Sequence, residues 1–540
     1  MDVGIDFGTT FSTLCYSATG AAGCTKVAGS IFVETQVFIP DDGSRYYIGK
    51  VAGKMYRDGI VGRLYINPKR WVGVNATNFS TFMKKLKPAY GVELLPTGVV
   101  EVGGIGTGRD IKVSVTDLIC LFLRGLIKEA ESETGMIVAS AVVTVPADYN
   151  SFKRGFVVTA LRGLGVPVKA IINEPTAAAL YSLAKSGLDD MLIAVFDFGG
   201  GTFDVSFVKK KGDIMVVVFS AGDNFLGGRD IDLALANVLK TKLTSDVDLG
   251  KLLFFVSTIK EDISNDASTE SHIVPTKNGS EIVRLTEAEL TEVVKPFAKR
   301  AVEIFSKAME RFLPDRAVAV LTGGSSALAE VRKQIRDLPS VASVVYDPED
   351  FRCSVACGAK VYCDCLGGKG SLRLIDTLTN SLSDEIVDFE PSLVFPKGSP
   401  IPCSYTTSYS VSTANVVYGV YEGEKNRSYL NELTFRCNYK HGSAGKRTDT
   451  VKYDLSLDGT LSVTINGVPG VNEFVTSRPT QLIGKKVYST GREDTEKEGV
   501  KEYCTLLNVL RSTTVVPDDI LLGRKPFTDL NVGVITNVTI

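Results

Sequence analysis

Short apolar runs alternate with segments of helical periodicity over roughly the first two thirds of the chain. The runs AVVTV, AIIN and AVAVLT each precede a segment of helical pattern, so helices are expected from about Ser151, Pro175 and Ala327. A longer helical segment opens with Thr286 and Glu289, which can form a capping box. This alternation of strands and helices predicts an α/β architecture.

The pattern changes after residue 366. Up to about residue 475, short runs such as SYSVST, VVYGVYEG and TLSVTING alternate apolar and polar positions between turn residues, which predicts a β-sandwich. One further helix is predicted between about Glu493 and Arg511. We therefore expect an α/β region at 1–366, a linker at 367–376, a β-sandwich at 377–475 and a C-terminal segment at 476–540.

Composition narrows the class of protein. A chain of 540 residues with 44% hydrophobic and 23% charged residues is typical of a soluble globular protein, and its net charge of -2 gives no general attraction to nucleic acid. No apolar run approaches the roughly 18 residues of a membrane span, and the acidic start MDVGIDFGTT is unlike a secretion signal. We expect a cytoplasmic protein that is not secreted and has neither a transmembrane segment nor a direct nucleic-acid site.

The ten cysteines of such a protein are expected to be reduced. The densest group comprises Cys353, Cys357, Cys363 and Cys365. It lacks the paired C-x-x-C spacing and the neighbouring histidine of common zinc sites. We interpret these four residues as small buried positions of a helix.

The stretch FDFGGGTFDVS, residues 196–206, separates two apparent strands with three glycines. Consecutive glycines allow backbone N–H groups to converge on an anion, and Asp197 and Asp204 supply carboxylates for Mg²⁺ or its waters. An ordinary β-hairpin with a glycine turn explains this stretch equally well when it is taken alone.

The N-terminal stretch VGIDFGTTFSTLCYS repeats the same plan with Asp6, Gly8, Thr9 and Thr10. Two strand-Asp-Gly-Thr-strand hairpins in one α/β region predict two related lobes that close on the same phosphates. Asp6 and Asp197 would then face a hydrated Mg²⁺ from opposite sides.

Other nucleotide-binding patterns are weaker. No G-x-x-x-x-G-K-[ST] loop occurs, which disfavours a P-loop enzyme, and GGIGTG at 103–108 is interpreted as a turn. The stretch LTGGSS at 321–326 follows a predicted strand, where it either passes close to a sugar and base or is simply a connection.

Six motifs in order resemble the ATPase domain of the 70-kDa heat-shock proteins, within the actin and sugar-kinase superfamily. They are GIDFGTTFS, AVVTVPADYN, IINEPTAAALY, FDFGGGTFDVS, GDNFLGGRDID and LTGGSSAL, and they cover residues 1 to about 366. More weakly, PKGSPIP, VYEGEKNR and DLSLDGTLSV resemble the family's peptide-binding sandwich. The resemblance implies an actin-like, two-lobed ATPase domain followed by a β-sandwich that resembles a substrate-binding domain.

The same resemblance implies ATP or ADP with Mg²⁺ as cofactors, and it assigns residues to them. Lys69 would orient the attacking water, while Asp6, Glu174 and Asp197 would hold Mg²⁺ through water. The implied catalytic set is Lys69, Asp6, Glu174, Asp197 and Thr202. The implied nucleotide-binding set is Gly8, Thr9, Thr10, Gly199, Gly200, Gly201, Asp204, Gly227, Gly228, Lys260, Ser264, Gly323, Gly324 and Ser325.

Four departures from the family pattern bear on function. Glu261 stands where the family usually has an arginine stacked on adenine, and Ser257 stands where it usually has glutamate, which weakens the expected adenine contact. Ala170 replaces an arginine that the family uses with J-domain cochaperones, and Arg373 is inserted in the apolar linker.

The C-terminal region departs most. Cellular members carry a helical lid after the sandwich, whereas here we expect a short, lidless segment, as in the heat-shock-70 homologues of closteroviruses, particularly of the ampelovirus type. That resemblance implies virion assembly and cell-to-cell movement, with viral structural, capsid-related and movement proteins and host cochaperones as partners. It places the protein in the host cytoplasm, at virions and plasmodesmata. A general peptide chaperone with a shortened lid and a nucleotide-dependent scaffold are the alternatives.

Overall fold

The computed structural model describes most of the first 472 residues and a short strand beyond them. Within 1–472 it leaves out residues 19–20, 44, 77, 97, 187–190, 246, 248, 267, 277–278, 349–350, 388–389, 429–430 and 458, and beyond residue 472 it describes residues 487–488. The predicted helix at 493–511 lies outside the described residues. Among the described helices, none combines the length and the apolar character that crossing a membrane requires.

The first lobe is built on a mixed sheet with β1 near its centre. Its strands run in the order β12 (Val168–Asn173), β11 (Ser140–Val145), β1 (Asp2–Asp6), β2 (Phe11–Ala18) and β3 (Ala21–Cys24), with β4 (Val33–Glu34) paired to β2. Parallel pairing of β1 with β11 and antiparallel pairing with β2 carry Asp6 to the end of the sheet. Helices α3 (Val115–Thr134) and α4 (Ser151–Gly163) contribute buried apolar residues to the core of this lobe.

The second lobe repeats this plan with a seven-stranded sheet. The order is β19 (Val341–Val345), β18 (Ala317–Thr322), β13 (Leu192–Phe198), β14 (Phe203–Lys211), β15 (Ile214–Asp223), β20 (Arg373–Thr377) and β23 (Pro400–Ile401). Its helices are α6 (Gly228–Lys242), α7 (Leu249–Asn265), α8 (Glu287–Met309) and α9 (Ala329–Arg336). The predicted capping box of Thr286 and Glu289 is confirmed at the start of α8.

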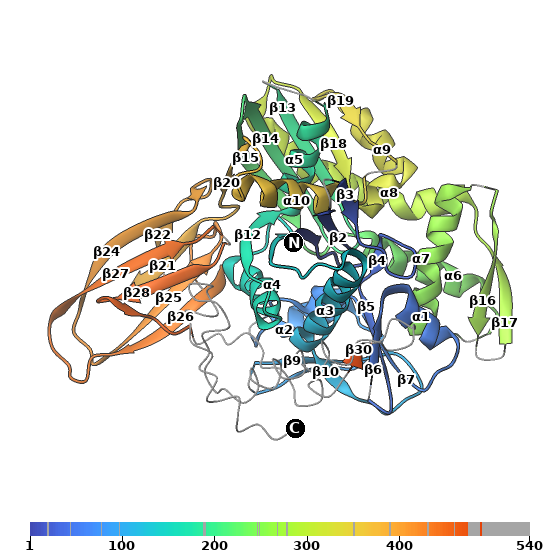
Figure 1. Ribbon diagram of the computed structural model, residues 1–540, viewed down its shortest axis with the longest axis horizontal. Helices are drawn as coiled ribbons and strands as arrows, with labels where there is room; N and C mark the ends of the chain where they lie inside the picture. The colour runs from blue at the N-terminus through green and yellow to red at the C-terminus, as the bar shows by residue number, and fades with distance from the viewer. Residues whose placement is uncertain are drawn as a thin grey trace.

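Helices α5 (Glu174–Ser186) and α10 (Ser354–Leu366) lie between the two sheets (Figure 1). They pack against each other and share one apolar core with strands of both lobes. The approach of α10 to β1 needs Gly4, because a Cβ there would lie 2.2 Å from the backbone nitrogen of Lys360. Strands and helices from distant parts of the sequence are thereby fixed around a common centre.

Smaller elements complete both lobes. The first lobe carries α1 (Gly49–Arg57), α2 (Phe79–Leu86), the 3₁₀ turn η1 (Pro68–Trp71), and the sheets β30 (Val487–Tyr488)–β6 (Arg45–Ile48)–β5 (Gln36–Pro40)–β7 (Gly62–Ile66) and β10 (Lys112–Ser114)–β9 (Val100–Gly103)–β8 (Val92–Leu94). The second lobe carries the hairpin β16 (Ser271–Thr276)–β17 (Gly279–Arg284) and the 3₁₀ turns η2 (Glu310–Phe312) and η3 (Gly324–Ala327).

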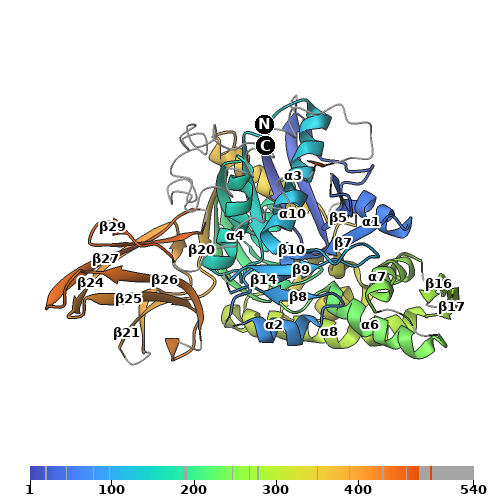
Figure 2. The same cartoon turned by 90° about the horizontal axis from the view of Figure 1, so that it is seen from below.

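A β-sandwich extends from one side of the α/β body (Figure 2). One sheet has the order β22 (Glu390–Phe395), β21 (Leu382–Val387), β25 (Asn415–Glu422) and β26 (Glu432–Lys440), and the other has β24 (Cys403–Val411), β27 (Arg447–Leu455), β28 (Leu461–Ile465) and β29 (Val468–Pro469). Inward-facing residues such as Val420, Phe435 and Tyr453 form its core. The alternating pattern seen in the sequence thus corresponds to two antiparallel sheets packed face to face.

The expected linker is part of a sheet in the structure. Helix α10 ends at Leu366, and β20 then pairs in parallel with β15, from Ile214 opposite Arg373 to Val216 opposite Ile375. Leu374 packs against the central core, whereas Arg373 is exposed. Alternation along a strand explains how the inserted arginine is accommodated without being buried.

The sandwich contacts the α/β body through the start of α4. The backbone nitrogen of Ser151 donates to Oε2 of Glu422 at 3.1 Å, and Nδ2 of Asn150 donates to Oε2 of Glu432 at 2.7 Å. Lys153 also forms a salt bridge of 3.3 Å with Glu432. Glu422 is buried at this contact, and burial raises the pKa of its carboxyl group to about 7.

The expectation that every cysteine is reduced is wrong for this structure, because Cys15 and Cys24 form a disulfide. They stand directly opposite each other on β2 and β3, with their Cα atoms 4.2 Å apart. Sequence spacing alone did not indicate this pairing, which depends on the register of the two strands.

Replacing Glu422 with glutamine should stabilise the folded chain at about pH 8 and have little effect near pH 5. The pKa of this buried carboxyl group is raised from 4.5 to about 7, so the folded chain binds a proton more tightly than the unfolded chain. The stability it contributes in protonated form is lost as the pH rises from about 4.5 to 7. Glutamine keeps the acceptor for Ser151 without the charge.

Thermal unfolding of the wild type and of Glu422→Gln, measured from pH 5 to 8, tests whether the pKa of Glu422 is raised. The exposed Glu303 on α8 provides the control variant Glu303→Gln. Parallel pH profiles for wild type and Glu422→Gln would contradict the prediction.

Candidate functional site

Two glycine hairpins meet at the centre of the molecule. The turn of residues 199–202 joins β13 to β14, and the turn of residues 7–10 joins β1 to β2. A Cβ at Gly200 would lie 2.1 Å from Oγ1 of Thr10, and one at Gly201 would lie 2.7 Å from Oγ1 of Thr9. The backbone of the second turn therefore packs against the threonine side chains of the first, and both turns line a shared cavity.

Most of the residues predicted for the site line this cavity. They are Asp6, Gly8, Thr9, Thr10, Glu174, Asp197, Gly199, Gly200, Thr202, Gly228, Lys260, Ser264, Gly323, Gly324 and Ser325. They come from both lobes and from elements that are far apart in the sequence. Oγ of Ser325 donates to the carbonyl of Gly199 at 2.9 Å, so the 321–326 turn is fastened to the second hairpin.

Four predicted residues are not in the cavity lining. Gly201 and Gly227 lie behind it, where the Cβ of a residue at 227 would lie 2.5 Å from the nitrogen of Gly201. Asp204 is buried on β14 and accepts a hydrogen bond from the backbone of Ala147 at 2.9 Å. Asp204 is thus not part of the lining, where sequence reasoning expected a metal or nucleotide contact, but it lies close enough to Glu174 and Asp197 for their charges to raise its pKa. The fourth residue, Lys69, also lies behind the lining.

Lys69 is buried behind the carboxylates of the cavity. Its Nζ forms an ion pair with Oε1 of Glu174 at 2.7 Å and donates to the carbonyl oxygen of Phe7. It is carried by the short 3₁₀ turn η1, while Glu174 is the first residue of α5. Lys69 therefore connects the first hairpin turn with the helix between the lobes.

The cavity gathers more negative than positive charge. Burial, followed by the nearby Glu174, raises the pKa of Asp6 to about 7, although Lys69 partly opposes this. Burial also raises the pKa of Asp197 well above its usual range, and Glu174 and Asp6 add to the effect. Carboxylates under this repulsion suit a hydrated divalent cation, and the adjoining glycine backbones suit phosphate, so the residues fit a magnesium nucleotide.

Side chains of α7 and of the segment that leads into α10 form another part of the cavity lining. Lys260 pairs with Asp232 at 2.7 Å, and both line the cavity together with Ser257 and Glu261, the two departures from the family pattern.

Arg352 also lines this part of the cavity, although sequence reasoning missed it. Its guanidinium carbon lies 5.8 Å from the ring centre of Phe11, 5.6 Å from that of Phe32 and 5.4 Å from that of Phe351. Its buried Nε has no hydrogen-bond partner among the described residues. In the sequence, Arg352 is visible only as an arginine just before the cysteine-rich helix. Its position beside the first hairpin depends on the folded structure.

Comparisons with known proteins agree with this geometry. A family model described as Hsp70 protein matches residues 2–474. The movement protein Hsp70h of Grapevine leafroll-associated virus 3 (isolate United States/NY1) is 55% identical over 98% of this chain and 97% of its own length. Its counterpart in Beet yellows virus (isolate Ukraine) is 30% identical over 87% of this chain and 82% of its own length. Chaperone protein dnaK of Thalassiosira pseudonana is 28% identical over 96% of this chain and 89% of its own length.

Replacing Asp197 with asparagine should stabilise the chain in the absence of ligand and weaken its response to Mg²⁺. Burial and two neighbouring carboxylates disfavour the charged form of Asp197, as its raised pKa indicates. Asparagine removes that charge and with it one ligand position for the ion. The unfolding midpoint should therefore rise without ligand, and the further rise on adding Mg²⁺ and ATP should shrink.

Differential scanning fluorimetry with and without Mg²⁺ and ATP measures both effects. Asp337→Asn, at an exposed position after α9, is the control. A variant that is less stable without ligand, or that keeps the full Mg²⁺ response, would argue against the proposed ion position.

Proposed function

The chain belongs to the Hsp70 family, and from this premise we propose that it is a viral Hsp70-like ATPase acting in filamentous virion assembly and cell-to-cell movement. Two relatives that align with most of its length are named movement protein Hsp70h. The observation that carries the enzymatic part is the Lys69–Glu174 pair beside two facing glycine hairpins. Members of the family bind ATP or ADP with Mg²⁺ and hydrolyse ATP.

We assign phosphate binding, ion binding and orientation of the attacking water to separate groups of residues. Backbone N–H groups of residues 9–10 and 200–202 hold the phosphates, and Asp6, Glu174 and Asp197 hold Mg²⁺ through its waters. When bound, the ion neutralises phosphate charge. The hydroxyl of Thr202 and the charge of Lys69 orient the attacking water, since Glu174 and the Phe7 carbonyl hold Nζ in one place.

A chain of contacts provides a route from this site to the sandwich. Asp204 follows the second hairpin turn and accepts from the nitrogen of Ala147 at 2.9 Å, while the carbonyl of Ala147 accepts from Oγ1 of Thr379 at 2.6 Å. Asn173, directly before Glu174, donates to Asp376 of β20 at 3.4 Å. We propose that rotation of the lobes changes these contacts and so changes how the sandwich binds its partners.

The proposed division of the chain follows from the same reasoning. Residues 1–366 form the ATPase domain, 367–376 the connection, 377–475 a sandwich that resembles a substrate-binding domain, and 476–540 the C-terminal segment. The expected partners are viral structural, capsid-related and movement proteins, with host cochaperones, in the cytoplasm at virions and plasmodesmata.

Replacing Lys69 with alanine should reduce ATP hydrolysis by at least about 100-fold, the scale for losing one positioned electrostatic group, while ATP binding is largely kept. The reason is that Lys69 lies behind the cavity lining, so the phosphate-binding backbones are unchanged. Single-turnover hydrolysis and calorimetric ATP binding distinguish the two effects. Lys84→Ala, at an exposed position on α2, is the control.

The same variant tests the viral role. A virus clone that carries Lys69→Ala should fail to spread between plant cells, whereas a clone with the control variant should spread. Normal spread without hydrolysis would overturn an ATP-driven role in favour of a nucleotide-dependent scaffold. Wild-type turnover by the variant would contradict the assignment of Lys69 itself.

Replacing Arg352 with alanine should weaken ADP binding by around tenfold, or about 1.4 kcal/mol, and leave tripolyphosphate binding unchanged. We propose that this guanidinium supplies the cationic surface for adenine that Glu261 does not, because it lies at the side-chain end of the cavity with an unpaired Nε. Competition binding with the two ligands separates base from phosphate recognition. Arg336→Ala, at an exposed position on α9, is the control. Equal losses for both ligands would show that Arg352 contacts phosphate and not the base.

A further inference from the structure

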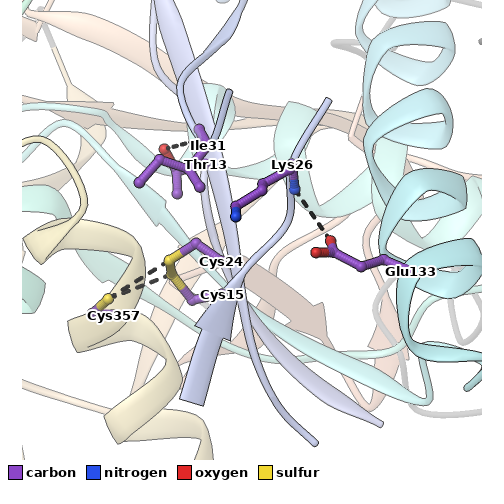
Figure 3. The surroundings of a disulfide bond; sticks show 7 residues. All are labelled: Thr13, Cys15, Cys24, Lys26, Ile31, Glu133 and Cys357. Carbon is purple, nitrogen blue, oxygen red and sulfur yellow. Dashed lines mark hydrogen bonds between the residues drawn. A yellow bond between two sulfur atoms is a disulfide. The ribbon is translucent and has the colours of Figure 1, made fainter. Parts of the chain in front are cut away.

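Three cysteine sulfurs converge where strands β2 and β3 pack against helix α10. Sγ of Cys357 on α10 lies 3.4 Å from Sγ of Cys15 on β2 and 3.9 Å from Sγ of Cys24 on β3 (Figure 3). All three ligand atoms lie within 4.8 Å of one another. Their convergence depends on the fold, since Cys24 and Cys357 are 333 positions apart in the chain.

The placement of Cys357 beside the disulfide disfavours simple thiol exchange. An attacking thiolate approaches along the axis of a disulfide, so it lies roughly 2 Å farther from the distal sulfur than from the near one. The distances of 3.4 Å and 3.9 Å are instead nearly equal. Cys357 therefore lies alongside the sulfur pair, as the third corner of a triangle.

A triangle of sulfurs is the arrangement that a soft metal ion requires. For metal–sulfur bonds of about 2.3 Å, tetrahedral or trigonal geometry separates the sulfurs by about 3.8–4.0 Å. The distances from Cys357 are close to that range. Reduction of the Cys15–Cys24 bond would let those two sulfurs separate and complete the set.

The surroundings leave room for an ion and for a further ligand. Cys15 is buried, whereas Cys24 and Cys357 are partly exposed, so an ion can reach the sulfurs from solvent. Among the described residues, no histidine, aspartate or glutamate joins the three cysteines within the same distance. A fourth coordination position therefore stays open to water, as in zinc sites with three protein ligands.

The polypeptide around the sulfurs is held by contacts other than the disulfide. Cys15 and Cys24 are paired in the ladder of β2 and β3. Beyond this ladder, the backbone of Lys26 donates to Glu133 on α3 at 3.2 Å (Figure 3). These hydrogen bonds keep the sulfurs close together after reduction, which limits the cost of forming the metal site.

We propose that the reduced chain binds one thiophilic d¹⁰ ion, such as Zn²⁺, through Cys15, Cys24 and Cys357. A dithiol reductant first donates two electrons and two protons to the Cys15–Cys24 bond, giving two thiols while the reductant becomes a disulfide. The ion then replaces the thiol protons, which pass to solvent. The four cysteines of the 353–365 segment do not bind it together, since only Cys357 among them belongs to this group.

Metal binding would join two elements that flank the nucleotide cavity. Strand β2 begins at Phe11, and α10 begins two residues after Arg352, and both of these residues line the cavity. An ion held by Cys15, Cys24 and Cys357 would cross-link β2 and β3 to α10. Because the chain closed by that link is long, the unfolded state loses much conformational freedom, and the folded state is stabilised.

The test titrates the full-length chain with Zn²⁺ and with Cd²⁺, after reduction and after oxidation. The reduced chain should bind one ion, show a thiolate-to-cadmium charge-transfer band for three sulfurs and unfold at a higher temperature with Zn²⁺. The oxidised chain should bind at least tenfold more weakly. Failure of the reduced chain to bind would overturn the proposal.

Single variants keep the outcome interpretable. Cys357→Ser should lower Zn²⁺ affinity at least tenfold and still form the Cys15–Cys24 disulfide on oxidation, which verifies that the fold is intact. Cys365→Ser, a partly exposed position on the same helix, should bind as wild type does. Unchanged affinity in Cys357→Ser, or a mixed disulfide to Cys357 without metal binding, would refute the site.

Discussion

The buried pairing of Lys69 with Glu174 controls the charge balance on which the central cavity depends. Among the carboxylates that line the cavity are those of Asp6, Glu174 and Asp197, and Lys69 contacts Glu174 directly, at 2.7 Å. Burial and mutual repulsion raise the pKa values of Asp6 and Asp197, so the folded chain holds excess negative charge there only at a cost. A cation bound there would relieve that cost.

The same constraint connects the cavity to the rest of the fold. Glu174 is the first residue of α5, which packs against α10. Asn173, the residue before Glu174, donates a hydrogen bond to Asp376 on β20. The strand β20 extends the sheet of the second lobe and precedes the sandwich. Packed elements and buried polar contacts therefore join Glu174 to the strand that precedes the sandwich.

Local patterns predicted much of this architecture, whereas contacts between distant segments escaped them. The alternation of apolar runs indicated the strands of both lobes, and the capping box at Thr286 is present because it depends on residues only three positions apart. The disulfide of Cys15 depends on strand register, and the incorporation of 373–377 into a sheet depends on an unpaired edge of β15. Neither register nor edge is visible in composition or spacing.

The two ends of the cavity differ in what can be inferred from sequence. At the proposed phosphate end, the side chain of Thr10 lies so close to the facing turn that only glycine fits at Gly200, and the chemistry is therefore readable as a motif. At the base end, side chains form the surface, and a cation can reach it from any neighbouring element. Arg352 reaches that end from the start of α10, far in sequence from Glu261 on α7. A change at one position can thus be compensated from another, so the loss of a single motif residue does not establish the loss of base binding.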